Sequence, residues 1–416
     1  MANRILIKVQ CFLVLIIIVL INGISVFAVS EAPEIKGVSA ILVESKRGQV
    51  LFEKESKSRL HISSANKMMT ALLALEKVGS KIDTPVTISK NAAAAQGSIL
   101  NLEVGGKYSI QDLVYTVILT SANDSATALA EYVGGDFQSF VNIMNDKARE
   151  LKMTDTNFTN PTGLYDEAQY TTAYDLAVLT RFALSNPYFE HMFSSQAKLW
   201  TNQGKVEVIT NSNNLFWSYN GIDGGKTGYN EVERQTAITT ATRDNLRVIS
   251  IVLDSPEKSV YDDSTKLLDY GFNNYKTGVL VKKDQTLKSI SVGDKPIDLI
   301  SPIDVYYTFP IGEDYIKAID LKLKEGIELP VLKTEVAGTM KYILKDNTEI
   351  GIDLYPAANV YSSVDMFSSM VKYMIEYRDI TILLFILVGI EVILVLVKIF
   401  KGLKNALTKV LSRSKI

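Results

Sequence analysis

Cysteine and histidine are scarce in this chain, which has one cysteine, Cys11, and two histidines, His61 and His191, among 416 residues. A single cysteine excludes a disulfide within the chain, and because Cys11 lies in an N-terminal apolar run it is no candidate nucleophile. The two histidines form no H-E-x-x-H pattern and accompany no nucleophile-elbow motif, which argues against a zinc site and a Ser-His-Asp hydrolase. We therefore expect neither a metal ion nor a cofactor.

The chain also lacks a large charge of either sign, since its formal net charge is −2 at pH 7. Nucleic-acid binding would require a clustered basic face, so we expect no nucleic-acid partner. The glycine pairs Gly134-Gly135 and Gly224-Gly225 lack the rest of any phosphate-binding loop. With 47% hydrophobic and 22% charged residues, the composition is that of a globular protein long enough for two domains.

The N-terminus has the features of a secretion signal. Arg4 and Lys8 precede an unbroken apolar run from Cys11 to Ile21, and Val26-Phe27-Ala28 is typical of a cleavage site. We interpret residues 1–28 as a signal peptide, with an uncleaved anchor as the alternative. The remainder of the chain would then be exported.

The C-terminus carries a second membrane signal. Residues 380–397 are apolar except for Thr381, Gly389 and Glu391, and the run is just long enough to span a bilayer. The tail, residues 398–416, contains basic residues and no acidic one, which predicts a cytoplasmic location. We expect a transmembrane helix over 380–397 that anchors the exported part outside, with a buried or interfacial helix as the alternative.

Between these ends the hydrophobic pattern changes twice. The first part predicts an α/β (α+β) domain over residues 35–275, in which an early hairpin and later strands form an antiparallel sheet with packed helices and a helical subdomain. Residues 276–363 predict a small all-β domain, and residues 364–379 a connecting segment. The expected hairpin is Ser39–Glu44 with Gln49–Glu53; the expected helices are a segment from Asn66, Ile110–Ile118, Ser125–Val133, Asp175–Leu184 and Ser259–Gly271; the expected strands are Val206–Thr210, Gln235–Thr242, Leu246–Leu253, Leu287–Val292, Asp304–Thr308, Ala318–Leu323 and Met340–Ile352 with a turn at Asp346-Asn347.

Three short motifs carry the chemistry. Ser64-Ala65-Asn66-Lys67 is S-x-x-K, Ser121-Ala122-Asn123 is S-x-N, and Lys226-Thr227-Gly228 is K-T-G. Together they are the signature of penicillin-binding proteins and class A β-lactamases. Each motif alone is weak, because the chain holds a second S-x-N at Ser212 and a second K-T-G at Lys276. The first three occur in order, with a helix expected after the first and strands after the third.

Each motif residue has a definite chemical use. Ser64 at a helix start would have Lys67 one turn later on the same face, and a desolvated lysine beside the second cation Lys226 has a pKa low enough to act as a base. Ser121 would relay a proton between Lys67 and the departing amine. Asn123 would hold the substrate backbone.

The K-T-G strand would bind the end of the substrate. Lys226 and Thr227 would bind a C-terminal carboxylate by charge and hydrogen bond. Gly228 and Tyr229 complete the predicted site, and the oxyanion would lie between the backbone N–H groups of Ser64 and Tyr229.

Residues 35–275 resemble the low-molecular-mass penicillin-binding proteins, the serine D-Ala-D-Ala carboxypeptidases. The resemblance rests on Ser64–Thr70, Ser121–Ala126, Asn160–Leu164, Thr172–Ala177 and Gly221–Tyr229, which run in the family's order. It implies the penicillin-recognising serine transferase/β-lactamase-like fold and attack by Ser64 on the bond between the last two D-alanines of a peptidoglycan stem peptide. It also implies covalent trapping by β-lactam antibiotics. The β-rich region and the C-terminal attachment resemble the family more loosely.

One departure from the family leaves alternatives open. After K-T-G, members carry a Thr within a few residues, then small residues and a glycine, whereas this chain has Glu231, Glu233 and Arg234. These charges would be a solvated turn, or they would change substrate preference or weaken activity. A catalytically weak penicillin-binding sensor or wall-binding protein is therefore one alternative. A β-lactamase is a second, although Glu150 and Glu167 lack the Glu-x-x-Leu-Asn context of its deacylating glutamate.

Overall fold

The computed structural model describes residues 31–202, 204–230, 234–256 and 258–413. The expected signal peptide, including Cys11, and the charged residues Glu231 and Glu233 therefore lie outside the described residues. The chain divides into two compact units. The first comprises Met1–Gly278 with Tyr306–Tyr315, and the second comprises Val279–Val305 with Ile316–Ile416.

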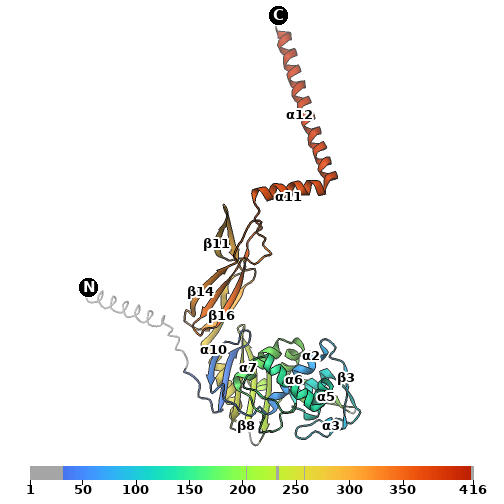
Figure 1. Ribbon diagram of the computed structural model, residues 1–416, viewed down its shortest axis with the longest axis vertical. Coiled ribbons are helices and arrows are strands. Elements are labelled where there is room, and N and C mark those ends of the chain that lie inside the picture. Colours follow the sequence, from blue (N-terminus) through green and yellow to red (C-terminus); the bar gives the residue numbers. More distant parts are fainter. Residues whose placement is uncertain (1–30, 203, 231–233, 257, 414–416) are drawn as a thin grey trace, which may run out of the picture. The chain divides into compact units, whose positions relative to one another are not determined.

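A five-stranded antiparallel sheet forms the centre of the first unit (Figure 1). The N-terminal hairpin supplies two strands, and the segment after the helices supplies three. Strand β1 lies between β2 and β9, so the beginning and the end of the unit are joined by hydrogen bonds. The strand order is β2 (Val50–Lys54), β1 (Ser39–Glu44), β9 (Leu246–Ser255), β8 (Arg234–Arg243) and β7 (Ile222–Asn230).

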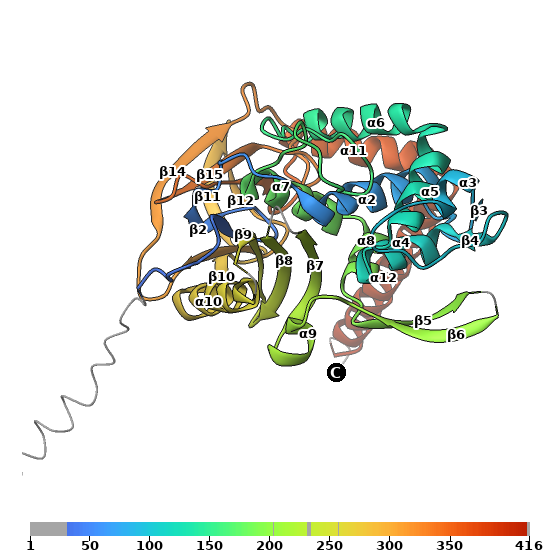
Figure 2. The same cartoon turned by 90° about the horizontal axis from the view of Figure 1, so that it is seen from below.

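Helices cover both faces of this sheet. Every residue of β1 is buried because its alternate side chains enter two different cores. Ile41 and Val43 join the larger core with the helical subdomain, while Ala40 and Leu42 join a smaller core with α10 (Ser259–Asn274). Figure 2 shows α10 beside one face and α7 (Ala173–Leu184), α2 (Lys67–Val78) and α8 (Pro187–Phe193) on the other side. The predicted antiparallel sheet with packed helices is confirmed.

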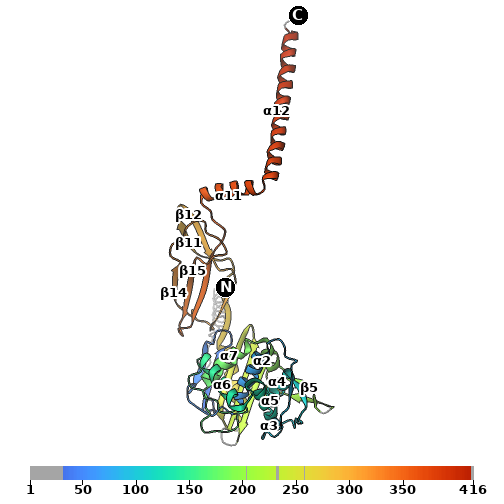
Figure 3. The same cartoon turned by 45° about the vertical axis from the view of Figure 1, so that its right-hand side comes forward.

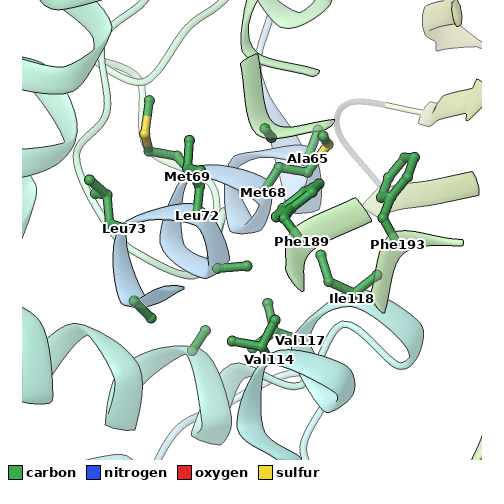
Figure 4. Packing of buried hydrophobic residues seen from close by; sticks show 14 of the residues in the cluster. Ala65, Met68, Met69, Leu72, Leu73, Val114, Val117, Ile118, Phe189 and Phe193 are labelled. Carbon is green, nitrogen blue, oxygen red and sulfur yellow. The ribbon is translucent and has the colours of Figure 1, made fainter. Parts of the chain in front are cut away.

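Helix α2 is the centre of the helical subdomain (Figure 4). Its buried Met68, Met69 and Leu72 belong to one hydrophobic cluster with Val114 and Ile118 of α4. Truncation of such a fully buried side chain to alanine costs about 2–5 kcal/mol, so this packing fixes the start of α2 firmly. The neighbouring helices are α4 (Ile110–Leu119), α5 (Asn123–Gly134) and α6 (Phe137–Glu150).

Several short elements complete the first unit. Helix α6 and the ribbon strand β5 were not among the elements expected from the sequence. In the ribbon, Trp200 of β5 is buried and stacks on Tyr108, with ring centroids 5.4 Å apart. The short elements are β3 (Pro85–Thr87), α3 (Lys90–Ala93), β4 (Lys107–Ser109), β5 (Ala197–Asn202), β6 (Lys205–Thr210) and α9 (Leu215–Ser218).

The second unit contains another five-stranded antiparallel sheet, shown in Figure 3. Alternate residues of β15 are buried, as expected for a strand with one face on a core. The predicted turn at Asp346-Asn347 joins β15 to β16. The strand order is β11 (Thr286–Val292), β12 (Lys295–Ile300), β16 (Glu349–Pro356), β15 (Gly338–Leu344) and β14 (Ile316–Leu323). The second K-T-G lies in β10 (Tyr275–Val281), which pairs with β13 (Val305–Pro310) in a separate two-stranded sheet.

Two helices follow the β strands. Most of the expected connecting segment is helix α11 (Ser363–Glu376), which begins one residue before it, and the expected span lies within α12 (Arg378–Arg413). Among the described residues, Arg378–Gly402 is the one helical stretch long and apolar enough to cross a membrane, and its most apolar 18 residues have a mean hydropathy of 3.1. This helix is compatible with a membrane anchor.

Candidate active site

Ser64 lies in a turn of 3₁₀ helix, η1 (Ser63–Asn66), directly before α2. Lys67 is the first residue of α2, so the S-x-x-K spacing places its side chain back toward the serine. The Lys67 Nζ atom donates to Ser64 Oγ over 3.2 Å and also donates to the carbonyl oxygen of Thr162. The amine is therefore within direct reach of the serine proton.

The environment of Lys67 favours its neutral form. The residue is 1% exposed. Burial, and secondly the charge of Lys226, hold the pKa of Lys67 well below its ordinary value. A neutral amine hydrogen-bonded to a serine hydroxyl is the arrangement that general-base activation requires.

Ser121 and Lys226 form the second half of the site. Ser121 lies between α4 and α5 in a left-handed conformation with φ of +62°, which is uncommon for a residue other than glycine and occurs often at functional sites. Its Oγ accepts a hydrogen bond of 3.0 Å from Lys226 Nζ. Lys226 is fully buried in β7, and burial lowers its pKa to about 7.

Asn123 begins α5 and donates hydrogen bonds to a neighbouring loop. Its Nδ2 donates to the carbonyl oxygen of Gln96 over 2.5 Å, and its backbone N–H donates to the carbonyl oxygen of Ser98 over 2.7 Å. Its Oδ1 is buried and has no hydrogen-bond partner among the described residues. An acceptor in that state is available to a donor from a ligand.

Gly228 allows β7 to approach the serine turn closely. A β-carbon at this position would lie 2.3 Å from Ser63 Oγ and 3.1 Å from Ser64 N. Only glycine therefore leaves space beside the Ser64 N–H group, where an oxyanion would bind. The next residue, Tyr229, is 59% exposed.

The loop from Asn160 to Leu164 contacts the residues around Ser64 and Lys67. Asn66 Nδ2 donates to the Asn160 carbonyl oxygen over 2.7 Å, and Asn160 Oδ1 accepts from the N–H of Gly163 over 2.7 Å. These bonds hold Thr162 where its carbonyl oxygen accepts from Lys67. The family-like sequence of this loop thus has a structural role, because the loop positions a hydrogen-bond acceptor for Lys67.

One pocket brings together the predicted residues of all three motifs. Ser64, Ser121, Thr227, Gly228 and Tyr229 line it, and the buried Lys67, Asn123 and Lys226 contact this lining or its loops. Its remaining lining residues, which sequence reasoning missed, are Ser98, Ser212, Gln235, Thr236, Val260 and Tyr261.

Ser212 is the one of these residues that carried a signal, since it begins the second S-x-N. Its Oγ lies 2.6 Å from Thr227 Oγ1. The sequence had shown this copy only as evidence that the motif is common, but the fold places it in the pocket with the first copy. Sequence order alone did not reveal that proximity.

The departure after K-T-G falls at the end of the β7–β8 hairpin. The backbones of Asn230 and Arg234 pair with each other. Glu231 and Glu233 lie outside the described residues, so the two alternatives for this segment stay as predictions. Within the described residues, no group of three His, Cys, Asp or Glu side chains is placed to hold a metal ion.

Comparison with known proteins agrees with the fold and the motifs. The profile of the D-alanyl-D-alanine carboxypeptidase peptidase family matches residues 26–257, and that of the C-terminal domain of penicillin-binding protein 5 matches residues 275–362. The D-alanyl-D-alanine carboxypeptidase DacF of Bacillus subtilis is 34% identical over 75% of this chain and 82% of that relative. The D-alanyl-D-alanine carboxypeptidase DacC of Escherichia coli is 31% identical over 76% of this chain and 82% of that relative.

Comparison with a solved structure supports the same family. Penicillin-binding protein 5 of Haemophilus influenzae superposes with a TM-score of 0.66 at 27% identity, over 80% of this chain and all of that structure. The chain therefore belongs to the D-alanyl-D-alanine carboxypeptidase family, the low-molecular-mass penicillin-binding proteins, and is a serine-type D-Ala-D-Ala carboxypeptidase. Membership implies a peptidoglycan substrate ending in D-Ala-D-Ala and binding of β-lactams.

Proposed function

We propose that Ser64 is the nucleophile of this carboxypeptidase and Lys67 its general base. The observation that carries the proposal is the 3.2 Å hydrogen bond between Ser64 Oγ and a lysine that is buried and has a lowered pKa. The neutral amine takes the hydroxyl proton as Ser64 Oγ attacks the carbonyl carbon between the last two D-alanines. Backbone N–H groups of Ser64 and Tyr229 stabilise the oxyanion.

Ser121, whose Oγ accepts a hydrogen bond from Lys226, relays a proton from Lys67 to the leaving amine. It gives its own hydroxyl proton to the amine and takes the proton that Lys67 received from Ser64, so that Lys67 is neutral again. D-Alanine leaves and the remaining peptide stays attached to Ser64 as an ester. A water molecule then attacks this ester, with Lys67 again accepting the proton, and Ser64 is regenerated. A β-lactam follows the first half of this path, and its opened ring stays on Ser64.

Substrate binding falls to the remaining motif residues. Asn123 holds the peptide backbone through its side-chain amide, whose Oδ1 is free of partners among the described residues. Lys226 and Thr227 bind the C-terminal carboxylate by charge and by hydrogen bond. Gly228 keeps the strand close enough for the substrate to pair with β7.

The location of the enzyme follows from its two ends. We propose that residues 1–28 direct export, that α12 crosses the membrane, and that the basic residues after 397 keep the tail in the cytoplasm. The catalytic domain and the small β domain then lie outside the membrane, where peptidoglycan is found. A protease added to intact spheroplasts should digest these two domains but leave the tail.

Release of D-alanine from a diacetylated Lys-D-Ala-D-Ala peptide tests the proposal. Detergent-solubilised full-length enzyme should release D-alanine, and the Ser64→Ala variant should release none above background. Release by that variant at the wild-type rate would rule out Ser64 as nucleophile. Labelling of Ser64 by a fluorescent penicillin without release of D-alanine would favour the sensor alternative.

A further inference from the structure

Ser212 lies in a segment that hydrogen bonds of its neighbours fix against the sheet. It lies between two buried asparagines, whose side chains hold the segment against the sheet. Asn211 Nδ2 donates to the carbonyl oxygen of Gly225 over 3.1 Å, and Asn213 Nδ2 donates to Thr239 Oγ1 over 2.8 Å. A β-carbon at Gly225 would lie 2.5 Å from Asn213 Nδ2, so the glycine permits this close approach.

The backbone of Ser212 is fixed as well. Its N–H donates to the carbonyl oxygen of Leu119 over 3.1 Å, and its own carbonyl oxygen accepts from the Tyr261 hydroxyl over 3.0 Å. These bonds do not involve the side chain. The hydroxyl can therefore be removed while the segment keeps its anchors.

The hydroxyl group itself is paired with the K-T-G motif. Ser212 Oγ lies 2.6 Å from Thr227 Oγ1, and this pair lies where solvent reaches it. In a pair of hydroxyls one donates to the other, and the acceptor keeps its own hydrogen for a third group. Such a chain polarises the outer hydrogen, which strengthens its bond to an anion.

The pocket lining offers a carboxylate no charged side chain among the described residues. Among the described residues that line it, none is charged and most carry hydroxyl groups. Lys226 lies beneath this lining, with its Nζ donating to Ser121 Oγ and to the carbonyl oxygen of Thr227 over 2.5 Å. A carboxylate entering the pocket therefore meets hydroxyl donors first.

We propose that Ser212 is a specificity-determining residue, which orients and polarises the Thr227 hydroxyl so that the enzyme selects peptides with a free C-terminal carboxylate. The proposal rests on the function proposed above and adds a residue outside the three motifs. Its acidic ligand is the terminal carboxylate of the D-Ala-D-Ala peptide, or the equivalent carboxylate of a penicillin.

The test compares a peptide ending in D-Ala-D-Ala with the same peptide ending in a carboxamide. In Ser212→Ala, KM for the carboxylate peptide should rise about tenfold with kcat changed less than about twofold, since the lost interaction is with the bound substrate. The kcat/KM for the carboxamide peptide should stay unchanged. The ratio of kcat/KM for the carboxylate peptide to that for the carboxamide peptide should therefore fall about tenfold. Ser212→Thr, which keeps the hydroxyl, should restore most of it.

Ser218→Ala is the matched control. Ser218 ends α9 six residues along the chain, and its hydroxyl donates to the Asn214 carbonyl oxygen outside the pocket. The Ser218→Ala enzyme should prefer the carboxylate peptide over the carboxamide peptide as strongly as the wild type does. Where the carboxamide peptide reacts too slowly, acylation rates with benzylpenicillin and its methyl ester give the same ratio.

The outcomes separate this proposal from the general function. An unchanged carboxylate preference in Ser212→Ala, in an enzyme that releases D-alanine, would overturn the role of Ser212 alone. Equal loss for both peptides together with a lower Tm would show a purely structural role and would also overturn it. Absence of both D-alanine release and penicillin labelling in the wild type would instead contradict the proposed function.

Discussion

Gly163 lies against the turn that carries the proposed nucleophile Ser64, in a contact that only glycine allows. Its φ is +75°, and a β-carbon there would lie 2.1 Å from the carbonyl oxygen of Ser63 and 2.6 Å from its carbonyl carbon. In Gly163→Ala the two backbones must separate by about 1 Å to reach ordinary contact. Ser63 directly precedes Ser64, and Thr162 directly precedes Gly163, so the displacement acts on both partners of Lys67.

The magnitude follows from this displacement. A misplacement of about 1 Å at a reacting group costs about 10²-fold in rate, so kcat/KM and the rate of penicillin acylation should fall by about that factor. The left-handed conformation adds about 1–2 kcal/mol for alanine, and the forced contact adds about 1–3 kcal/mol. The free energy of unfolding should therefore fall by about 2–5 kcal/mol.

Gly135→Ala provides the control, because Gly135 has a φ of +78° but, among the described residues, no atom lies within 4 Å of the position that an alanine methyl group would take. That variant has the same conformational strain without the steric contact. It should lose about 1–2 kcal/mol of stability and keep wild-type acylation. Stopped-flow acylation with a fluorescent penicillin and thermal unfolding measure both quantities. Wild-type acylation in Gly163→Ala, or an equal loss in Gly135→Ala, would refute the reasoning.

Three further predictions concern the lysine pair, the oxyanion site and the anchor. The pKa of Lys226 is lowered from 10.5 to about 7 by burial, so the wild type should lose stability as pH falls from 10.5 towards 7. Lys226→Met should remove this loss of stability, which is on the order of 3–5 kcal/mol, and should therefore raise Tm at pH 7. The same variant should release no D-alanine. A lower Tm at pH 7 would contradict this prediction. Gly228→Ala should reduce kcat at least about 10²-fold, because its methyl group would crowd the Ser64 N–H; unchanged kcat would place the oxyanion elsewhere. Deletion of the chain from Arg378 should release the enzyme from the membrane fraction at unchanged kcat; continued sedimentation with membranes would show a second attachment.

Local patterns were sufficient to predict much of the first unit. The hairpin of β1 and β2, helices α2, α4, α5, α7 and α10, and strands β6, β8 and β9 all occur where periodicity placed them, within a few residues. The link between Ser64 and Lys67 could also be predicted, because residues three apart are neighbours in a helical turn. The structure places that serine in a 3₁₀ turn rather than in the α-helix itself.

Contacts between distant segments were beyond such patterns. Thr162 accepts from Lys67 across 95 residues, and Ser212 reaches Thr227 from a segment with no regular period. The left-handed Ser121 depends on how two helices meet, which no local propensity specifies. The close approaches of Gly163 and Gly228 likewise arise from tertiary packing.

Location of the penicillin adduct tests the central claim most directly. Full-length enzyme would be acylated by benzylpenicillin and digested with trypsin, which should release the peptide Leu60–Lys67 containing both Ser63 and Ser64. The account predicts an adduct whose fragment ions assign it to Ser64 and which is absent from Ser64→Ala. An adduct on Ser63, Ser121 or Ser212, or one that persists in Ser64→Ala, would contradict it.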